Sequence, residues 1–195
     1  MSRGRPLEFD RDTALEAAMQ LFWSRGYEAT SLQDLLGSMG IARSSFYQSF
    51  GSKQEVFLLA VERYRDCLVD ALRQSLAVAD SGIAFIEDTL KSVAADAGGA
   101  DGPRGCLVFN SAAEFGQKNP DVAGRVAASI DAFTRVFADA ISRAQQEGDV
   151  PPERDPVLMA RYIVCTMSGL RTLAKAGARR KELNDLAHLA LASLT

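Results

Sequence analysis

The sequence is poor in histidine, cysteine and proline, and two of these shortages exclude classes of site. Its one histidine, His188, leaves too few imidazoles for most metal sites and most His-dependent catalysis. The three cysteines, Cys67, Cys106 and Cys165, are odd in number and widely spaced. That spacing argues against a disulfide framework and against zinc, whose ligands come in close pairs. The sequence therefore predicts no metal and no other cofactor.

Long hydrophobic runs are also missing. No stretch approaches the roughly 20 apolar residues that span a bilayer, and residues 1–10 lack the apolar core of a signal peptide. We therefore expect a cytoplasmic protein that does not partner a membrane. Hydrophobic residues make up 47% of the chain, which indicates a globular protein. A length of 195 residues suits one or two domains. Only six residues are proline, and Ala, Leu, Glu and Arg are frequent, which indicates an all-α fold.

The net charge of −3 does not by itself identify a partner. Residues 1–53 hold six basic and six acidic side chains, so the excess negative charge lies in the rest of the chain. The basic side chains of this first part gather before residue 12 and at Arg43 and Lys53. Phosphate contacts act locally under salt screening, so this placement keeps nucleic acid open as a partner.

Apolar residues at helical spacing predict helices along the whole chain. Leu15, Ala18, Met19 and Phe22 give a first buried face, with Asp10 or Asp12 as the cap. A short helix after Thr30–Ser31 ends at Gly40, and a third covers Arg43–Gln48. A long fourth helix begins after Ser52, with Val56, Ala60, Tyr64, Cys67, Ala71 and Leu72 expected inside. Further helices are expected over Ile83–Ala97, Cys106–Gln117, a segment starting at Pro120, Leu158–Ala176 and Lys181–Leu194.

Two short helices joined by the turn Met39–Gly40–Ile41 predict a helix-turn-helix, whose second helix enters the DNA major groove. Phe46 and Phe50 would anchor that second helix. Its polar residues would then face outward, where they can bond to base edges or phosphates. These residues are Arg43, Ser44, Ser45, Tyr47 and Gln48. Taken alone, the run is equally compatible with a solvated helix end.

Over residues 26–57, "GYEATSLQDLLGSMGIARSSFYQSFGSKQEVF", the sequence resembles the TetR family of bacterial transcriptional regulators. Ala29–Thr30, Gly40–Ile41, Tyr47, Phe50 and Lys53 stand at the spacing typical of that family. The resemblance implies an all-α fold of about nine helices. It also implies a helix-turn-helix DNA-binding domain over 1–53, a connecting helix over about 52–76, and an effector-binding and dimerisation domain over 54–195.

The resemblance further implies roles for matching residues. Thr30, Tyr47 and Lys53 would contact backbone phosphates, and Arg43, Ser44, Ser45 and Gln48 would read bases. Arg3 and Arg5 would either reach the minor groove or belong to a disordered tail. Ala42 departs from the family pattern, because a Ser or Thr commonly caps the recognition helix there. That cap is lost unless Ser44 or Ser45 replaces it.

By the same resemblance the protein is expected to be a homodimer that presents two recognition helices to a palindromic operator in double-stranded DNA. The dimer contacts would come from about 158–176 and 181–194. Two apolar stripes suit this role, although both could instead be intramolecular core. They are Met159, Ile163, Met167 and Leu170, and Leu183, Leu186, Ala190 and Leu194.

Regulators of this family usually bind a small-molecule effector that favours the DNA-incompetent state. The sequence does not identify that effector. Aromatic and Met side chains of the second domain are candidates for its pocket, with ordinary core packing as the alternative. They are Phe85, Phe109, Phe115, Phe133, Phe137, Tyr162 and Met167.

The segment "GPRGCLVFNSAAEFG" places Cys106 at a helix start, where partial positive charge favours a thiolate. It resembles the Gly-Cys-Leu run of a TetR branch that includes repressors sensing electrophiles and oxidants. Arg104 is near in sequence, and Lys175 is expected near in space. The alternative is that Cys106 only packs as a small hydrophobe. Cys67 and Cys165 fall on expected apolar faces and are assigned to the core.

Two other classes of function are weighed against a regulator, for which repression is the family default. An enzyme needs a convergent nucleophile and base or a metal, and no such motif is found, although Asn110, Glu114 and Lys175 could be polar groups of a pocket. An architectural DNA-binding protein would bind any sequence with a steep salt dependence. Residues 1–53 carry no net charge, which argues against an architectural DNA-binding protein.

Overall fold

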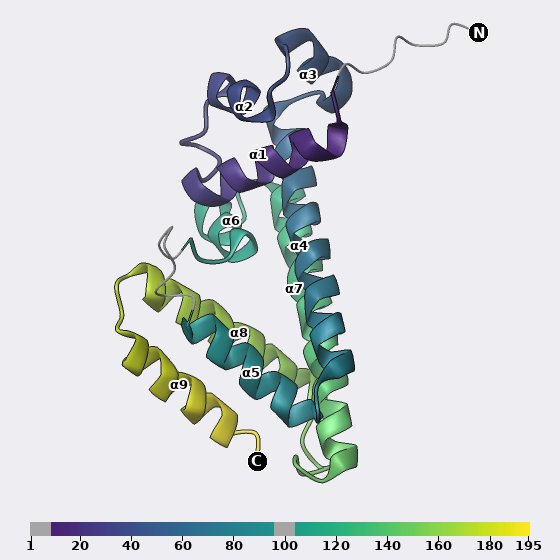
Figure 1. Cartoon of the computed structure of the whole chain (residues 1–195), viewed down its shortest axis with the longest axis vertical. Coiled ribbons are helices and arrows are strands. Elements are labelled where there is room, and N and C mark those ends of the chain that lie inside the picture. The colour runs from purple at the N-terminus through teal and green to yellow at the C-terminus, as the bar shows by residue number, and fades with distance from the viewer. Residues whose placement is uncertain (1–8, 96–103) are drawn as a thin grey trace, which may run out of the picture.

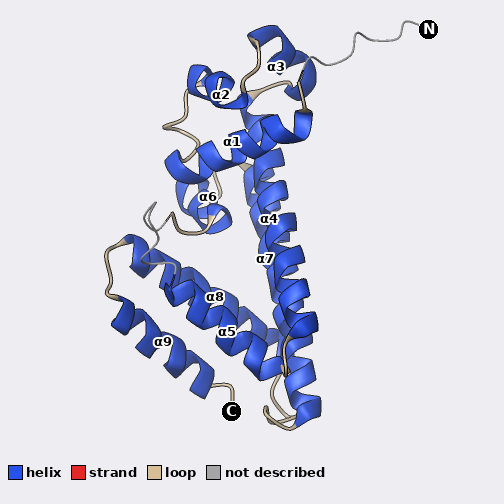
Figure 2. Cartoon of the chain, in the orientation of Figure 1, coloured by secondary structure: helices blue, strands red, loops and turns tan. Residues whose placement is uncertain are grey.

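The computed structural model describes residues 9–95 and 104–195, and within these ranges it is all-helical, without a strand (Figure 1, Figure 2). The all-α prediction is therefore confirmed. The helices are α1 (Arg11–Arg25), α2 (Leu32–Met39), α3 (Arg43–Phe50), α4 (Lys53–Val78), α5 (Gly82–Ala95), α6 (Leu107–Phe115), α7 (Pro120–Glu147), α8 (Pro156–Lys175) and α9 (Arg180–Ala192).

Helices α1, α2 and α3 form a head at one end of the molecule, seated on the first turns of α4 (Figure 1). Local signals fix where these helices begin. The Asp10 carboxylate accepts from the Thr13 N–H at 2.7 Å, and Ser31 and Asp34 form a capping box at α2. Gly40 ends α2 with φ 65°, a left-handed conformation that suits glycine and makes the tight turn into α3.

The rest of the chain forms a helical body. Helices α4 and α7 run side by side down the molecule, and α5, α8 and α9 form a group set at an angle to them (Figure 1). Helix α6 lies between this body and α1 (Figure 1). Helix α6 therefore connects the head to the body, as α4 does.

Two of the cysteines are not where the sequence predicted them. Cys67 and Cys165 are exposed in this single chain, and Ala71 is exposed as well. Val56 and Ala60 are fully buried and Tyr64 is only 6% exposed, so the periodicity predicts the first turns of α4 correctly. Cys67 shares the angular position of Val56 and Ala60 but lies further along α4, where that side of the helix is exposed.

The two stripes expected at a dimer contact are largely internal. Met159, Ile163, Met167 and Leu170 are buried within the chain, as are Leu183, Ala190 and Leu194, and only Leu186 is exposed. These two stripes therefore belong to the core of the single chain, which was the alternative to a dimer contact. The outward apolar residues of α8 and α9 are a different set: Val157, Leu158, Tyr162, Leu173, Leu186 and Leu189.

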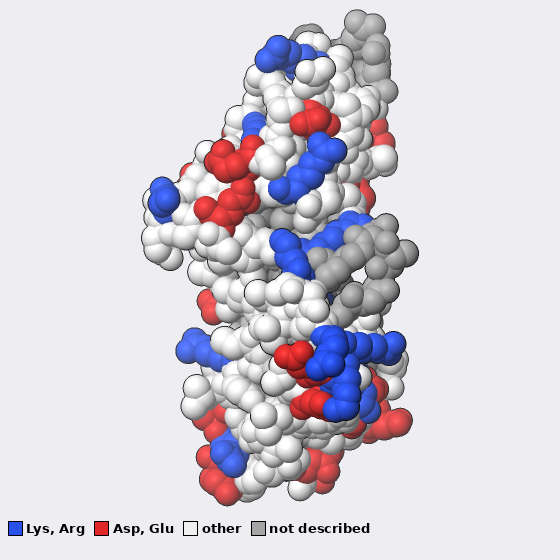
Figure 3. All heavy atoms as spheres, turned by 90° about the vertical axis from the view of Figure 1, so that its left-hand side faces the viewer, with Lys and Arg blue, Asp and Glu red and all other residues white. Residues whose placement is uncertain are grey.

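Charge is distributed without a dominant sign on the face that includes α9. Figure 3 shows basic and acidic side chains interspersed there, with wide uncharged areas between them. The basic residues do not merge into one continuous surface on this side. This pattern agrees with the small net charge of −3.

Candidate DNA interface and effector cavity

Helix α3 presents a polar face outward. Phe46 and Phe50 are buried at 0% and 4% exposure, as predicted, and they fix the orientation of the helix on the head. The residues between and before them point away from the core. Arg43, Ser44, Tyr47 and Gln48 are exposed, and Ser45 is half-buried. The face therefore combines a guanidinium, hydroxyls and an amide, the groups that bond to base edges and phosphates.

The start of α3 lacks a side-chain cap, as predicted. Ala42 occupies the N-cap position, and no side chain bonds to the free N–H groups there. Neither Ser44 nor Ser45 replaces the missing cap. The first turn of α3 thus offers backbone donors on the same side of the head as its polar side chains.

Lys53 is the first residue of α4, next to the Ser52 cap. Its Nζ lies 4.1 Å from the centre of the Tyr27 ring, which holds the ammonium over an aromatic face. Tyr27 in turn contacts Phe57 and Phe115, with ring centres 5.0 and 5.1 Å away. Lys53 is therefore held in place at the edge of the head by the aromatic cluster that joins α4 to α6.

Thr30 is not at the surface where a phosphate contact requires it. The residue is fully buried, and its hydroxyl donates to the Gly26 carbonyl oxygen at 2.6 Å. Ser31, not Thr30, caps α2. The hydroxyl of Thr30 thus closes the α1–α2 turn. Arg3 and Arg5 lie outside the described residues.

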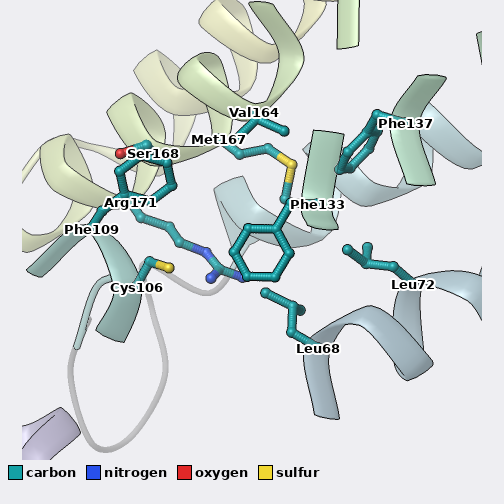
Figure 4. Close-up of a pocket in the computed structure, with 10 residues that line it drawn as sticks. All are labelled: Leu68, Leu72, Cys106, Phe109, Phe133, Phe137, Val164, Met167, Ser168 and Arg171. Atoms are coloured by element: carbon teal, nitrogen blue, oxygen red, sulfur yellow. The ribbon is translucent and has the colours of Figure 1, made fainter. Parts of the chain in front are cut away.

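A narrow cavity opens among α4, α6, α7 and α8 (Figure 4). It holds about 320 Å³ of space not filled by protein atoms, part of it open to solvent. The lining residues are Leu68, Leu72, Cys106, Phe109, Phe133, Phe137, Val164, Met167, Ser168 and Arg171. Cys106, Phe109, Phe133, Phe137 and Met167, all named from the sequence, come together here.

Other residues proposed from the sequence lie elsewhere. Tyr162 is 42% exposed in a surface groove between α8 and α9, and Phe85 faces a separate hollow between α4 and α5. Phe115 packs against Tyr27 at the head. Lys175 lines a cleft with Asn110 and Glu114, so the three polar residues do share a pocket, but it is not the cavity that contains Cys106.

Cys106, Tyr64 and Arg171 form a polar cluster at the cavity. Arg171 Nη1 donates to the Tyr64 hydroxyl at 3.2 Å, and the Cys106 sulfur faces the guanidinium (Figure 4). Burial raises the pKa of Tyr64 well above its ordinary value, the Cys106 thiol raises it further, and the Arg171 guanidinium opposes them. The phenol is therefore neutral near pH 7. Sequence reasoning missed Arg171, although its i+4 spacing from Met167 places it on the inward face of α8.

The segment that contains Cys106 is bonded to the head at both ends. Arg104 Nη1 donates to Gln20 Oε1 at 2.8 Å, and Trp23 Nε1 donates to the Gly105 carbonyl oxygen at 3.1 Å. At the far end of α6, Glu114 accepts from backbone N–H groups of the α1–α2 turn. We call these contacts the α6 bridge. A displacement of α6 is thereby passed to α1.

Neither cation expected beside Cys106 lines the cavity. Arg104 turns toward α1, with its guanidinium 5.2 Å from the Trp23 ring centre, and Lys175 lies in the cleft described above. Arg171 occupies the place beside Cys106 instead. Cys106 is the N-cap residue of α6 and is 5% exposed.

Within the described ranges, no helix is long and apolar enough to cross a membrane. The same part of the chain contains no group of three or more His, Cys, Asp or Glu side chains placed to hold a metal ion.

The head and its outward α3 define a helix-turn-helix protein of the kind that reads DNA, joined to a helical body. Residues 14–60 match the family described as bacterial regulatory proteins, tetR family, and residues 83–189 match the tetracyclin repressor-like C-terminal domain. The chain belongs to the TetR family, whose members regulate transcription.

Individual relatives cover almost the whole chain. The HTH-type transcriptional repressor ComR of Escherichia coli K12 is 30% identical over 95% of this chain and 89% of its own length. The HTH-type transcriptional regulator YezE of Bacillus subtilis 168 is 31% identical over 98% and 99%. A cysteine mutant of the TetR-family regulator CifR, solved with 26-base-pair operator DNA, is 32% identical over 98% and 100%, with a TM-score of 0.85.

Proposed function

We propose that the protein is a homodimeric repressor that binds a palindromic operator through α3. A small molecule in the cavity, or modification of Cys106, releases it. The observation that carries this proposal is the α6 bridge, because it bonds the cavity segment directly to the DNA-reading head. The DNA-binding unit is assigned to residues 1–53 and the effector unit to 54–195.

The DNA contacts are assigned to the outward face of α3 and to Lys53. Arg43 suits bidentate recognition of guanine, while Ser44, Ser45 and Gln48 suit weaker base contacts. Tyr47, 49% exposed, and Lys53 suit phosphates flanking the reading helix. The relatives support this assignment, since CifR mutants were solved in complex with operator DNA.

The dimer contact is assigned to the outward apolar residues of α8 and α9. Leu158 and Leu189 are 65% and 67% exposed, although both are large and apolar. Tyr162, Leu173, Leu186 and Leu189 border one shallow groove on this face. An apolar patch spread over two neighbouring helices is typical of a subunit contact. A two-fold pairing would bring α8 and α9 of each copy together in a four-helix arrangement.

The switch is assigned to the cavity. Its free space is narrow, so a ligand larger than a few atoms must displace side chains such as Met167 or Phe133. Displacement on that side pushes on α4 and α6, and both lead to the head. An effector that binds better to the displaced state lowers the population able to bind DNA.

Cys106 offers a covalent route to the same displacement. The Cys106 thiol loses its proton to solvent, and the thiolate then adds to the β-carbon of a small α,β-unsaturated carbonyl compound. The carbon–carbon π bond breaks, and the α-carbon takes up a proton from solvent. The added group then occupies cavity space beside Phe109 and Arg171. A noncovalent ligand and a Cys106 adduct would therefore act through one movement, and a Cys106→Ser variant separates them.

Neither rival class gains support. Asn110, Glu114 and Lys175 share a cleft but show no paired nucleophile and base, so we assign no enzymatic activity. The mixed charge of the face in Figure 3 and the net charge of −3 do not suit an architectural protein that binds DNA of any sequence. A regulator that binds DNA in this way acts in the cytoplasm of a bacterium.

The test uses purified protein and labelled DNA from upstream of its own gene, because regulators often control themselves. Affinity for this DNA and for a shuffled sequence is measured by fluorescence anisotropy at one salt concentration. Arg43→Ala should reduce the preference for upstream DNA by about 1–3 kcal/mol. The control is Arg135→Ala, which removes an exposed arginine of α7 and should leave the preference for upstream DNA unchanged. Equal binding of both DNAs by the wild type, repeated in a selection from random sequence, would contradict the proposal.

A further inference from the structure

We propose that the cavity selects small amphipathic molecules with a carboxylate at one end of an apolar body, and that Arg171 selects the carboxylate. This inference rests on the proposed function of the cavity as the effector site. It adds the chemical class of the effector and the residue that distinguishes that class.

The walls of the cavity are apolar around one cation. Of the described residues that line it, the only charged one is Arg171, and Phe109, Phe133 and Phe137 form much of the rest (Figure 4). A guanidinium presents N–H groups in a planar fork that matches the two oxygens of a carboxylate. An ion pair formed among apolar side chains is stronger than one in water. The aromatic rings would cover the apolar body of the same molecule.

Tyr64 holds Arg171 in position at the cavity wall. It is buried on α4, and its hydroxyl accepts from Arg171 Nη1 at 3.2 Å. Burial raises the pKa of Tyr64, so the phenol keeps its proton near pH 7. Tyr64 therefore holds Arg171 from α4 as a neutral partner and leaves the positive charge of the guanidinium in place at the cavity wall.

A wider hollow between α4 and α5 leads to this end of the cavity. The two spaces share Leu68, Leu72, Met167 and Arg171, so Arg171 stands at their junction. Asp80 and Asp88 line the hollow, but both are exposed to solvent, where salt screens their charge. The acid group of a ligand would therefore stop at Arg171, with the apolar body turned inward toward the phenylalanines.

The position of Tyr64 connects this recognition to the head. Its ring packs edge-on against Trp23 of α1, with ring centres 5.1 Å apart, and Trp23 is part of the α6 bridge. An incoming carboxylate competes for the N–H donors of Arg171 with the groups that hold them in the ligand-free protein. A shift of Arg171 changes its bond to Tyr64, and Tyr64 contacts α1 directly.

The test compares matched acids and amides by isothermal titration calorimetry on the full-length protein without DNA. The pairs are 3-phenylpropionate with 3-phenylpropanamide, and hexanoate, octanoate and decanoate with their amides. Each pair has nearly the same shape and differs in charge. The wild type should bind the best acid about 10- to 150-fold more tightly than its amide.

Three variants assign the selectivity to Arg171. Arg171→Leu should remove the preference for the acid, and Arg171→Lys should keep part of it, since an ammonium retains the charge without the fork. Arg135→Leu, which removes an exposed guanidinium of α7, should keep it fully. Circular dichroism of each variant confirms that the helices are intact. If Arg171→Leu unfolds, the comparison rests on Arg171→Lys.

Amides that bind wild type as tightly as acids would overturn the proposal and leave the cavity as a binding site for neutral molecules. Failure of every acid to bind more tightly than about 1 mM would also overturn it. Neither result depends on operator DNA. A protein that selects acids but ignores upstream DNA would contradict the proposed function alone, and one that is released from DNA by a Cys106 adduct but ignores acids would contradict this inference alone.

Discussion

Glu114 accepts hydrogen bonds from two successive backbone N–H groups, those of Tyr27 at 3.0 Å and Glu28 at 2.7 Å. These residues lie 87 and 86 positions away in the sequence. The backbone donors belong to the turn between α1 and α2, which has no regular structure to satisfy them. A single carboxylate on α6 thus fixes the turn that sets α2 against α1.

Replacing Glu114 with Gln should loosen this turn. Gln keeps one carbonyl oxygen but presents an amino group where the second acceptor was, so one backbone N–H loses its partner. We expect a loss of about 1 kcal/mol in unfolding free energy, or a fall of about 2–4 °C in the unfolding temperature. Differential scanning calorimetry measures it. Glu153→Gln in an exposed loop is the control, and equal unfolding temperatures for both variants would contradict the role of Glu114.

Asp34 should make the stability of the head depend on pH. The Ser31 hydroxyl and N–H hydrogen bonds hold the pKa of Asp34 below its ordinary value of 3.8. The stabilisation is therefore complete above pH 3.8 and is lost as the pH falls from there through the lowered pKa. The unfolding free energies of wild type and Asp34→Asn in urea should differ most near pH 6, and the difference should shrink as the pH falls below 3.8. A difference that stays constant over this range would contradict the role of the Asp34 carboxylate.

At the scale of helices, the starts of three are readable from single residues. Asp10, Ser31 and Ser52 cap α1, α2 and α4, and the structure confirms that α3 lacks a cap at Ala42. Caps are predictable because a side chain and a backbone donor two or three residues away form a complete local unit.

A substitution at Ala42 tests this reading of α3. Ala42→Ser should supply the missing acceptor and raise the unfolding free energy by about 1 kcal/mol. Ser31→Ala is the matched opposite, because it removes the cap of α2 and should lower the free energy by a similar amount. Thermal unfolding of both variants shows whether each substitution raises or lowers the stability. A destabilising Ala42→Ser would contradict the cap geometry.

What the sequence did not predict depends on how helices meet. Periodicity placed Cys67 inside, but the face of α4 that becomes buried is decided by the angle at which α1 and α7 pack on it. The same holds for Arg171, because its hydrogen-bond partner Tyr64 lies 107 residues away in the sequence. Thr30 was expected at a phosphate because its family position suggested it, and only the fold reveals its bond to Gly26.

At the scale of the whole molecule, the proposed dimer depends on residues that a single chain leaves exposed. Leu189→Glu should therefore leave the fold of each subunit intact while preventing association, because it places a charge in the centre of the contact. Sedimentation equilibrium should give 21.0 kDa for the variant and about twice that for the wild type. Val78→Glu, at a residue 83% exposed at the end of α4, is the control and should remain dimeric. A dimeric Leu189→Glu would contradict the assigned face.

If the cavity controls DNA binding by the head, a small adduct on Cys106 should change operator affinity whatever the natural effector is. In a Cys67→Ser, Cys165→Ser background, methyl methanethiosulfonate can modify only Cys106. The Cys106 thiolate attacks the sulfenyl sulfur, a disulfide to the methylthio group forms, and methanesulfinate leaves.

Operator affinity is then measured by anisotropy before treatment, after treatment and after reduction, with mass spectrometry to confirm the adduct. We predict that affinity for upstream DNA falls at least about tenfold on modification, or about 1.4 kcal/mol, and returns with dithiothreitol. The matched variant that also carries Cys106→Ser should not respond. Complete modification of Cys106 with unchanged operator affinity would contradict the claim that this cavity controls DNA binding.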